Sequence, residues 1–175
     1  MRYVIVSVVK GNAGDFNNNL RKEIYEKFKA KSSKLPAHFT IKAPFEYDGD
    51  ISELQSIIKN LCNIGNKPVY TINGYNHFDN RVIYMDLHMS KEGEIFHNKI
   101  VDELSKLSYI NFTKSDGKNK VFHVTLASKR IQDIYYEIWS YVNKIPCNFN
   151  CEFDNICIYA WDNNKWNLVH EYIIK

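Results

Sequence analysis

Two short segments of this chain repeat one pattern of residue types. Residues 38–41 read His-Phe-Thr-Ile and residues 123–126 read His-Val-Thr-Leu. A looser match at His88-Met89-Ser90 is followed by Lys91 instead of an apolar residue. One such motif arises easily by chance, and a single copy would predict no more than a packed histidine. Two copies in matching surroundings favour a functional role.

Each copy is expected to form a β-strand with one polar and one apolar face. Side chains along a strand alternate between faces, so His38, Thr40 and Lys42 are expected to share one face. His123 and Thr125 are expected to share a face of the second strand. Placed side by side, the two strands would present two imidazoles and two hydroxyls to one cleft.

The order of elements around the two motifs is also repeated. Each half is expected to run strand, helix, basic loop, His-x-Thr strand, helix and strand, and one further strand ends the chain. The first half comprises a strand at 2–9, a helix capped by Asp15, a loop at 29–36, a strand ending near Pro44, a helix from Ser52 to Gly65 and a strand from Val69. The second half comprises a strand at 82–87, a helix at 91–107, a loop, the His123 strand, a helix at 131–142, and strands at 151–160 and 165–174.

The length of 175 residues suits one domain with a substantial core. We expect two pseudo-symmetric halves, about 1–77 and 78–175, whose equivalent strands face each other across a groove. The apolar run at 3–9 is too short to cross a membrane and lacks a signal-peptide cleavage site. We therefore expect a soluble, cytoplasmic protein that does not bind membranes and is a monomer.

Basic residues gather around the two motifs although the net charge is only +3. Residues 27–42 contain five lysines and no acidic residue, and residues 114–130 contain five basic residues against Asp116 alone. This distribution predicts a cleft that attracts anions. The basic residues are Lys27, Lys29, Lys31, Lys34 and Lys42 in the first stretch and Lys114, Lys118, Lys120, Lys129 and Arg130 in the second.

Two histidines supply an acid and a base for displacement at phosphorus. An imidazole titrates near about pH 6.5, so one ring can accept a proton from water while the other donates a proton to the leaving oxygen. The hydroxyls of Thr40 and Thr125 can donate to the non-bridging oxygens. Lys42, with Lys129 or Arg130, can offset the charge that builds there. This chemistry needs no metal ion or cofactor.

Other kinds of site are less favoured. The motifs lack the carboxylates that hard metal ions prefer, although a zinc ion bound by histidines stays open. No Gly-x-Ser-x-Gly motif is present, and no cysteine adjoins either histidine motif. The cysteines match no zinc spacing and are expected to be reduced core residues; they are Cys62, Cys147, Cys151 and Cys157.

The remaining histidines and aromatic residues carry no motif. His97 is expected on a helix surface, and His77 and His170 at strand ends or turns. Aromatic rings near the cleft rim could stack on a base, but core packing is their commoner role. These aromatic residues are Tyr75, Phe78, Phe112 and Phe122.

The paired motifs, His38-Phe39-Thr40-Ile41 and His123-Val124-Thr125-Leu126, resemble the two signatures of the two-histidine (2H) phosphoesterase superfamily. Its bacterial members are often described as 2′-5′ RNA ligase-like proteins or RNA 2′,3′-cyclic phosphodiesterases. The resemblance covers nearly the whole chain in layout but only about eight residues in identity. Many relatives carry a basic residue directly after Thr-Leu-Ala, where this chain has Ser128 followed by Lys129 and Arg130.

The resemblance implies a bilobal α+β fold with two antiparallel or mixed sheets, helices outside, and the histidines in the cleft between the sheets. It implies metal-independent hydrolysis of a 2′,3′-cyclic phosphate or a 2′-5′ linkage at RNA ends or in small nucleotides, with weak reverse ligation. By position, His38 and His123 would be the catalytic pair, and Thr40 and Thr125 would hold the phosphate. The alternative is a non-catalytic module that binds a nucleotide or RNA in the same cleft. The enzyme is favoured, because binding alone would tolerate lysine or arginine in place of the histidines.

Overall fold

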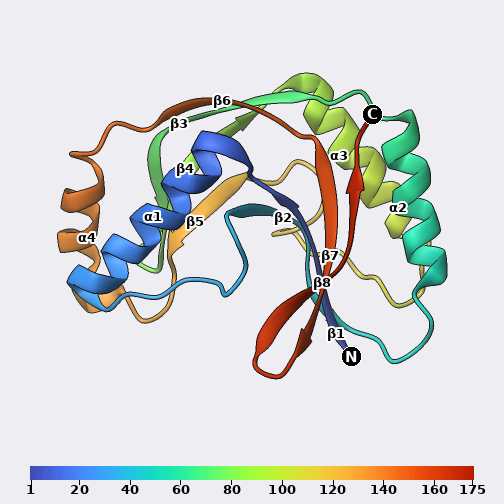
Figure 1. The fold of residues 1–175 in the computed structure, drawn as a ribbon, viewed down its shortest axis with the longest axis horizontal. Helices are drawn as coiled ribbons and strands as arrows, with labels where there is room; N and C mark the ends of the chain where they lie inside the picture. The colour runs from blue at the N-terminus through green and yellow to red at the C-terminus, as the bar shows by residue number, and fades with distance from the viewer.

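The computed structural model describes all residues, 1–175, and contains two four-stranded antiparallel sheets (Figure 1). The prediction of a two-sheet α+β fold is therefore confirmed. The first sheet has the order β2-β1-β7-β8, and its strands are β1 (Arg2–Val8), β2 (His38–Glu46), β7 (Asn155–Asp162) and β8 (Lys165–Ile173). The second has the order β5-β4-β3-β6, and its strands are β3 (Val69–Phe78), β4 (Val82–Met89), β5 (His123–Ala127) and β6 (Asn148–Glu152).

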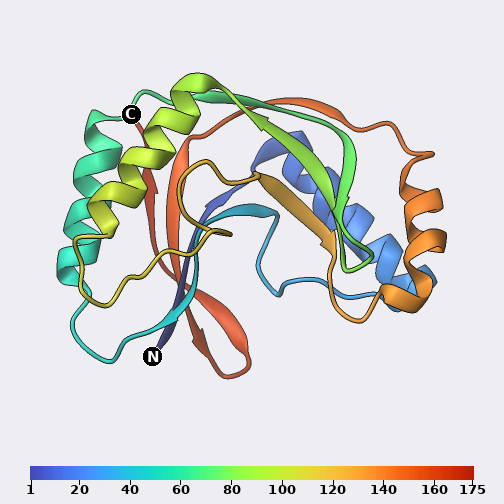
Figure 2. The ribbon, with the colours of Figure 1, turned by 180° about the vertical axis from the view of Figure 1, so that it is seen from behind.

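The helices lie in two groups. Figures 1 and 2 show α2 and α3 together beside the first sheet, and α1 and α4 beside the second. Apolar residues at helical spacing explain the packing, since Leu54 and Ile58 of α2 and Ile100 and Leu104 of α3 are fully buried. None of the helices has the length and hydropathy needed to cross a lipid bilayer. The helices are α1 (Gly11–Phe28), α2 (Ser52–Ile64), α3 (Lys91–Leu104) and α4 (Tyr135–Val142), with the short 3-10 helix η1 (Gln132–Ile134) before α4.

The chain crosses from the second sheet to the first between β6 and β7, at Phe153 and Asp154. The sequence predicts one strand at 151–160, and this prediction is wrong. The N–H of the fully buried Phe153 donates to the carbonyl of Pro68 at 2.7 Å, and this bond is the last contact in the ladder between β6 and β3. The side chain of Asn155 then exchanges two hydrogen bonds of 2.8 Å with the backbone of Val8 and aligns β7 with β1.

Each sheet contains strands from both halves of the sequence. β3 comes almost entirely from the first half of the sequence but lies in the second sheet, while β7 and β8, from the second half, complete the first sheet. In each sheet the strand that carries a motif histidine is an edge strand, β2 or β5, next to β1 or β4. The two motifs therefore occupy equivalent positions in the two sheets.

Helix α1 begins at Gly11, four residues before the Asp15 cap predicted from the sequence. Gly11 has φ of +60°, which a glycine adopts without strain, and it starts the helix directly after β1. Gly14 lies in the first turn of the helix, where any larger residue would clash, because a Cβ there would lie 2.1 Å from the carbonyl oxygen of Val9. Gly11 therefore lets the chain turn into the helix, and Gly14 lets the first turn of the helix pack closely against Val9.

A β-bulge in β2 separates Lys42 from the motif residue Thr40. Val6 of β1 lies opposite Thr40, but Ile5, the preceding residue, lies opposite Lys42. Because consecutive residues of β1 point to opposite faces, Lys42 and Thr40 also point to opposite faces. The prediction that Lys42 shares the face of the motif residues is therefore wrong, since the bulge changes the register by one residue.

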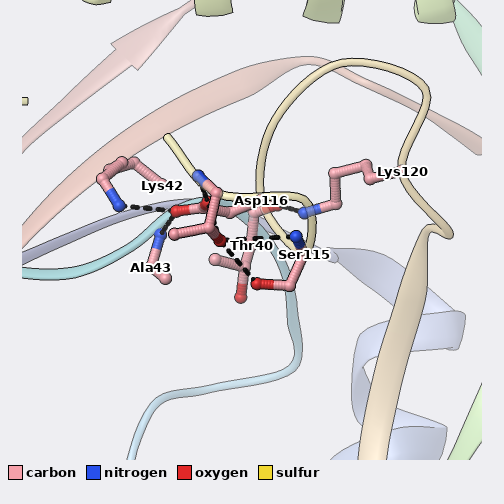
Figure 3. Close-up of polar contacts among 7 residues, drawn as sticks. Thr40, Lys42, Ala43, Ser115, Asp116 and Lys120 are labelled. Atoms are coloured by element: carbon pink, nitrogen blue, oxygen red, sulfur yellow. Dashed lines mark hydrogen bonds and ion pairs between the residues drawn. The ribbon is translucent and has the colours of Figure 1, made fainter. Parts of the chain in front are cut away.

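Lys42 instead contacts the loop between α3 and β5, residues 105–122, through Asp116 (Figure 3). Oδ2 of Asp116 accepts hydrogen bonds from the Lys42 ammonium at 2.5 Å and from the N–H of Ala43 at 3.0 Å. Its Oδ1 accepts the N–H and the hydroxyl of Thr113, each at 2.7 Å. Burial alone would raise the pKa of Asp116, but these hydrogen bonds lower it to about 2. We call this set of bonds the Asp116 clasp.

His97 of α3 lies in the core and not on the helix surface, so the sequence prediction for it is wrong. Its side chain is 1% exposed, and its ring packs edge-on against Phe122 with 5.0 Å between centroids. Asn98 lies beside the ring, yet neither ring nitrogen makes a hydrogen bond of ordinary geometry within the chain. Burial, together with the charge of Lys120, lowers the pKa of His97 to about 4.

We expect Asp116→Asn to cost about 3–5 kcal/mol of unfolding free energy, because it leaves the buried Lys42 ammonium without a counter-charge. Urea denaturation measures the loss. Asp116→Asn combined with Lys42→Met should recover much of it, since no unpaired charge then remains. The matched control, Glu103→Gln, breaks the solvent-accessible pair with Lys106 and should cost less than about 1 kcal/mol. Equal losses in Asp116→Asn and Glu103→Gln would contradict the structural role of the clasp.

We expect His97→Leu to reduce the pH dependence of stability on the acid side. The folded-state pKa of His97 is about 4 and the unfolded value is about 6.5, so the unfolded chain binds the extra proton between these values. The contribution of neutral His97 to the unfolding free energy is fully present above about pH 6.5 and is lost as the pH falls towards 4. Urea titrations at several pH values should show a shallower fall for His97→Leu and no change for the exposed His170→Leu. An unchanged slope in His97→Leu would refute this prediction.

Candidate active site

The two motif histidines occupy the first positions of β2 and β5 and make the same backbone contact. Nδ1 of His38 lies 2.6 Å from the carbonyl oxygen of Pro36, and Nδ1 of His123 lies 3.1 Å from that of Val121. A carbonyl oxygen can only accept, so each Nδ1 carries the hydrogen in the neutral ring. In both histidines Nε2 is therefore the nitrogen left free to take up or release a proton.

The structure brings the two histidines together between the sheets. Phe39 and Phe122, their chain neighbours, meet edge to face with 5.7 Å between ring centroids. The charge of a protonated His123 is near enough to lower the pKa of His38. The two imidazoles thus lie near each other, although 85 residues separate them in the sequence.

Both histidines are poised to be neutral in the unliganded protein. Burial lowers the pKa of His38 to about 4, assisted by the charges of Arg21, His123 and Lys120, and the bond to Pro36 only partly opposes this shift. Burial and the charge of Lys120 also lower the pKa of His123. A bound anion would favour the protonated form of either ring.

The two motif threonines lie beside the histidines with unused hydroxyls. Thr40 and Thr125 are half-buried, and neither hydroxyl makes a hydrogen bond within the chain. Each threonine follows its histidine by two residues, so it shares the histidine's face of the strand. The register confirms this face for Thr125, because its partner Tyr84 also packs against the ring of His123, with 5.1 Å between centroids.

Lys120 is a residue of this site that the sequence analysis did not single out. Its ammonium donates to the backbone carbonyl of Thr40 (Figure 3), and its charge lowers the pKa of both motif histidines. Burial lowers the pKa of Lys120 itself to about 8, although Asp116 opposes the shift. The only sequence signal was its membership of the basic loop, which did not reveal that the Asp116 clasp holds this loop against β2.

Phe78 and Tyr84 form an aromatic wall around His123. The ring of Phe78 meets the imidazole edge to face at 5.0 Å between centroids, and Phe78 and Tyr84 also contact each other at 4.6 Å. Both lie in adjacent strands of the second sheet. Packing of this kind holds the imidazole in one orientation and restricts access of water to it.

The predicted basic residues do not share one place in the structure. Lys42 points to the opposite face, as described above. Lys129 and Arg130 follow the end of β5, and at about 3.3 Å per residue Lys129 is roughly 20 Å along the chain from His123. Lys129 lines a separate pocket, and Arg130 is exposed with φ of +56°. No group of three or more His, Cys, Asp or Glu side chains is arranged to hold a metal ion.

Comparisons with known proteins address the family and the fold of the chain. The family model described as the 2′-5′ RNA ligase superfamily matches residues 14–165. The structure of TT0787 from Thermus thermophilus is similar, with a TM-score of 0.69 at 10% identity over 99% of this chain and 98% of that one. E. coli LigT in its apo form gives a TM-score of 0.61 at 11% identity over 99% and 97% of the two chains.

No curated protein matches the sequence at a significant level. The solved structures are too distant in sequence to show more than the shared fold, whereas the family model covers most of the chain. The chain therefore belongs to the 2′-5′ RNA ligase superfamily.

Proposed function

We propose that this protein is a metal-independent phosphodiesterase that cleaves 2′,3′-cyclic phosphates or 2′-5′ linkages at RNA ends or in small nucleotides. One observation carries the proposal: two imidazoles, each hydrogen-bonded through Nδ1 to the carbonyl two residues before it, lie near each other with a threonine two residues after each. Two histidines that served packing alone would not both need a hydrogen bond from Nδ1 to the carbonyl two residues earlier. Structures of E. coli LigT with ATP and with 3′-AMP support a nucleotide as the ligand.

In the proposed reaction His38 and His123 act on opposite sides of the phosphorus atom. Nε2 of the neutral ring takes a proton from the attacking water, and Nε2 of the protonated ring donates its proton to the leaving ribose oxygen. The hydroxyls of Thr40 and Thr125 donate to the non-bridging oxygens, where negative charge increases in the transition state. If the 5′-hydroxyl of a second RNA end replaced water as the nucleophile, its oxygen would bond to phosphorus as the bond to the 3′-oxygen broke, and a 2′-5′ linkage would form; water competes with this weak ligation.

Lys120 replaces Lys42 as the cation we assign to the reacting phosphate. Lys42 is 4% exposed and its ammonium is paired with Asp116, so it has no free charge to offer. The ammonium of Lys120 lies against the backbone of Thr40 in the first motif and acts electrostatically on both histidines. We also propose that these residues act within one domain, as the shared core of the two sheets suggests.

We expect His38→Ala and His123→Ala each to lower kcat/KM by about 100-fold or more, because each removes one partner of the acid–base pair. The measurement is hydrolysis of a 2′,3′-cyclic nucleotide and of a 2′-5′ dinucleotide in excess chelator. His170→Ala, a change of an exposed histidine in β8, is the matched control and should keep full activity. Activity retained in either motif variant would refute the mechanism, and nucleotide binding without turnover by the wild type would favour the binding module.

We expect the kcat/KM profile to be bell-shaped with its optimum between about pH 4 and pH 6.5. The pKa of His38 is about 4 and that of His123 is also lowered, so the protonated partner becomes scarce above this range. The profile of kcat should lie at higher pH, because the bound phosphate raises the pKa of both rings. Lys120→Met should move the kcat/KM optimum to higher pH by removing a charge that lowers both pKa values. An optimum above pH 7 in the wild type would contradict this assignment.

A further inference from the structure

A second basic feature lies next to the histidine pair but outside it. An open pocket of about 400 Å³ is formed by α1, the loop that follows it and Lys129, the second residue after β5. Its lining contains five basic side chains and no acidic one. The basic residues are Arg21, Lys22, Lys31, Lys34 and Lys129. We call it the basic pocket.

Backbone hydrogen bonds hold these like charges together. The carbonyl of Lys31 accepts the N–H groups of Ser128 and Lys129, at 3.0 and 3.1 Å, so the two lysines are adjacent in space. Arg21 donates to the carbonyls of Ser33 and Leu35 and thereby shapes the loop from α1. Because neighbouring like charges repel each other, an arrangement kept by the fold favours a bound anion.

Most of this positive charge is not neutralised by the protein. The only ion pair of a pocket residue joins Lys22 to Glu26 at 4.0 Å on the exposed surface of α1. Lys34 donates to the backbone and side-chain oxygens of Asn164, at 2.7 and 3.0 Å, and Arg21 contacts carbonyl oxygens, all of which are uncharged partners. The pocket therefore keeps a net positive charge that a phosphate group can neutralise.

The basic pocket begins beside His38 and leads away from it. Oδ1 of Asn18, in the pocket lining, accepts the N–H of Ala37 at 3.1 Å, and Ala37 directly precedes His38. The charge of Arg21 lowers the pKa of His38, which also places the pocket close to the imidazole. From Asn18 to Tyr25 the pocket follows α1 for about 10 Å. Tyr25 at the far end is exposed, and the ammonium of Lys31 lies over its ring, 5.9 Å from the ring centroid.

We propose that the basic pocket binds the backbone phosphate of the nucleotide next to the reacting end of the substrate. This assignment rests on the proposed function and narrows its substrate class: an RNA strand end of two or more nucleotides is preferred to a free cyclic nucleotide. A mononucleotide has no phosphate beyond the reacting one, so it gains nothing from the pocket. In an RNA end the next phosphate along the strand reaches the lysines while the terminal phosphate lies between His38 and His123.

The test compares uridine 2′,3′-cyclic phosphate with an RNA trinucleotide that ends in a 2′,3′-cyclic phosphate. We expect Lys22→Gln combined with Lys31→Gln to lower kcat/KM for the trinucleotide about tenfold and to leave the mononucleotide within twofold. The slope of log(kcat/KM) against log salt concentration should fall by about 0.7 for each lysine–phosphate interaction that the substitutions remove, and only for the trinucleotide. The matched control, Lys59→Gln with Lys99→Gln on the exposed faces of α2 and α3, removes the same net charge and should change neither substrate.

Equal losses for both substrates, no loss for the trinucleotide, or the same loss in the control would overturn the assignment. Failure of the proposed function gives a different result, since the wild type would then hydrolyse neither substrate. In that case fluorescence anisotropy with a 5′-labelled RNA trinucleotide 3′-phosphate tests the pocket directly. Weaker binding in Lys22→Gln/Lys31→Gln and unchanged binding in the control would support the pocket, and equal binding in all three proteins would refute it.

Discussion

The ion pair between Lys42 and Asp116 is the contact on which the geometry of the site depends. It joins β2 of the first sheet to the loop that leads into β5 of the second, and both charged groups are almost completely buried. A buried pair is costly to desolvate and contributes little net stability compared with apolar packing, but it tolerates little change in geometry. Its main effect here is positional, because the same loop carries Lys120 to the first motif and ends at His123.

The resting electrostatics of the site suit an anionic substrate. Burial and nearby cations lower the pKa of both imidazoles, so both rings are uncharged at neutral pH when no anion is bound. Entry of a phosphate would reverse this balance, since the anion stabilises the proton that one ring needs as the general acid. The substrate itself would thus help to create the protonation state in which it reacts, and an empty site would remain largely inactive.

The sequence was sufficient to predict the elements that depend on local patterns. Alternation and helical spacing predicted nearly all strands and helices, and the repeated motif identified the histidines and threonines that the structure brings together. The errors arose where distant contacts decide the structure. A bulge of one residue turned Lys42 away, a loop covered the face of α3 that carries His97, and Asn155 redirected one expected strand into another sheet. Lys120 was not singled out because its position depends on the Asp116 clasp, which links residues 74 apart in sequence.

Because the chain crosses to the first sheet only between β6 and β7, that sheet is completed late in folding. β1 is the second strand of its sheet, and its neighbour β7 is made only after most of the chain has been synthesised. Until then β1 has an unpaired side that could associate with other chains. The many pairings between distant residues also predict slow folding. The sheet that carries His38 therefore cannot be completed until β7 and β8 have been synthesised.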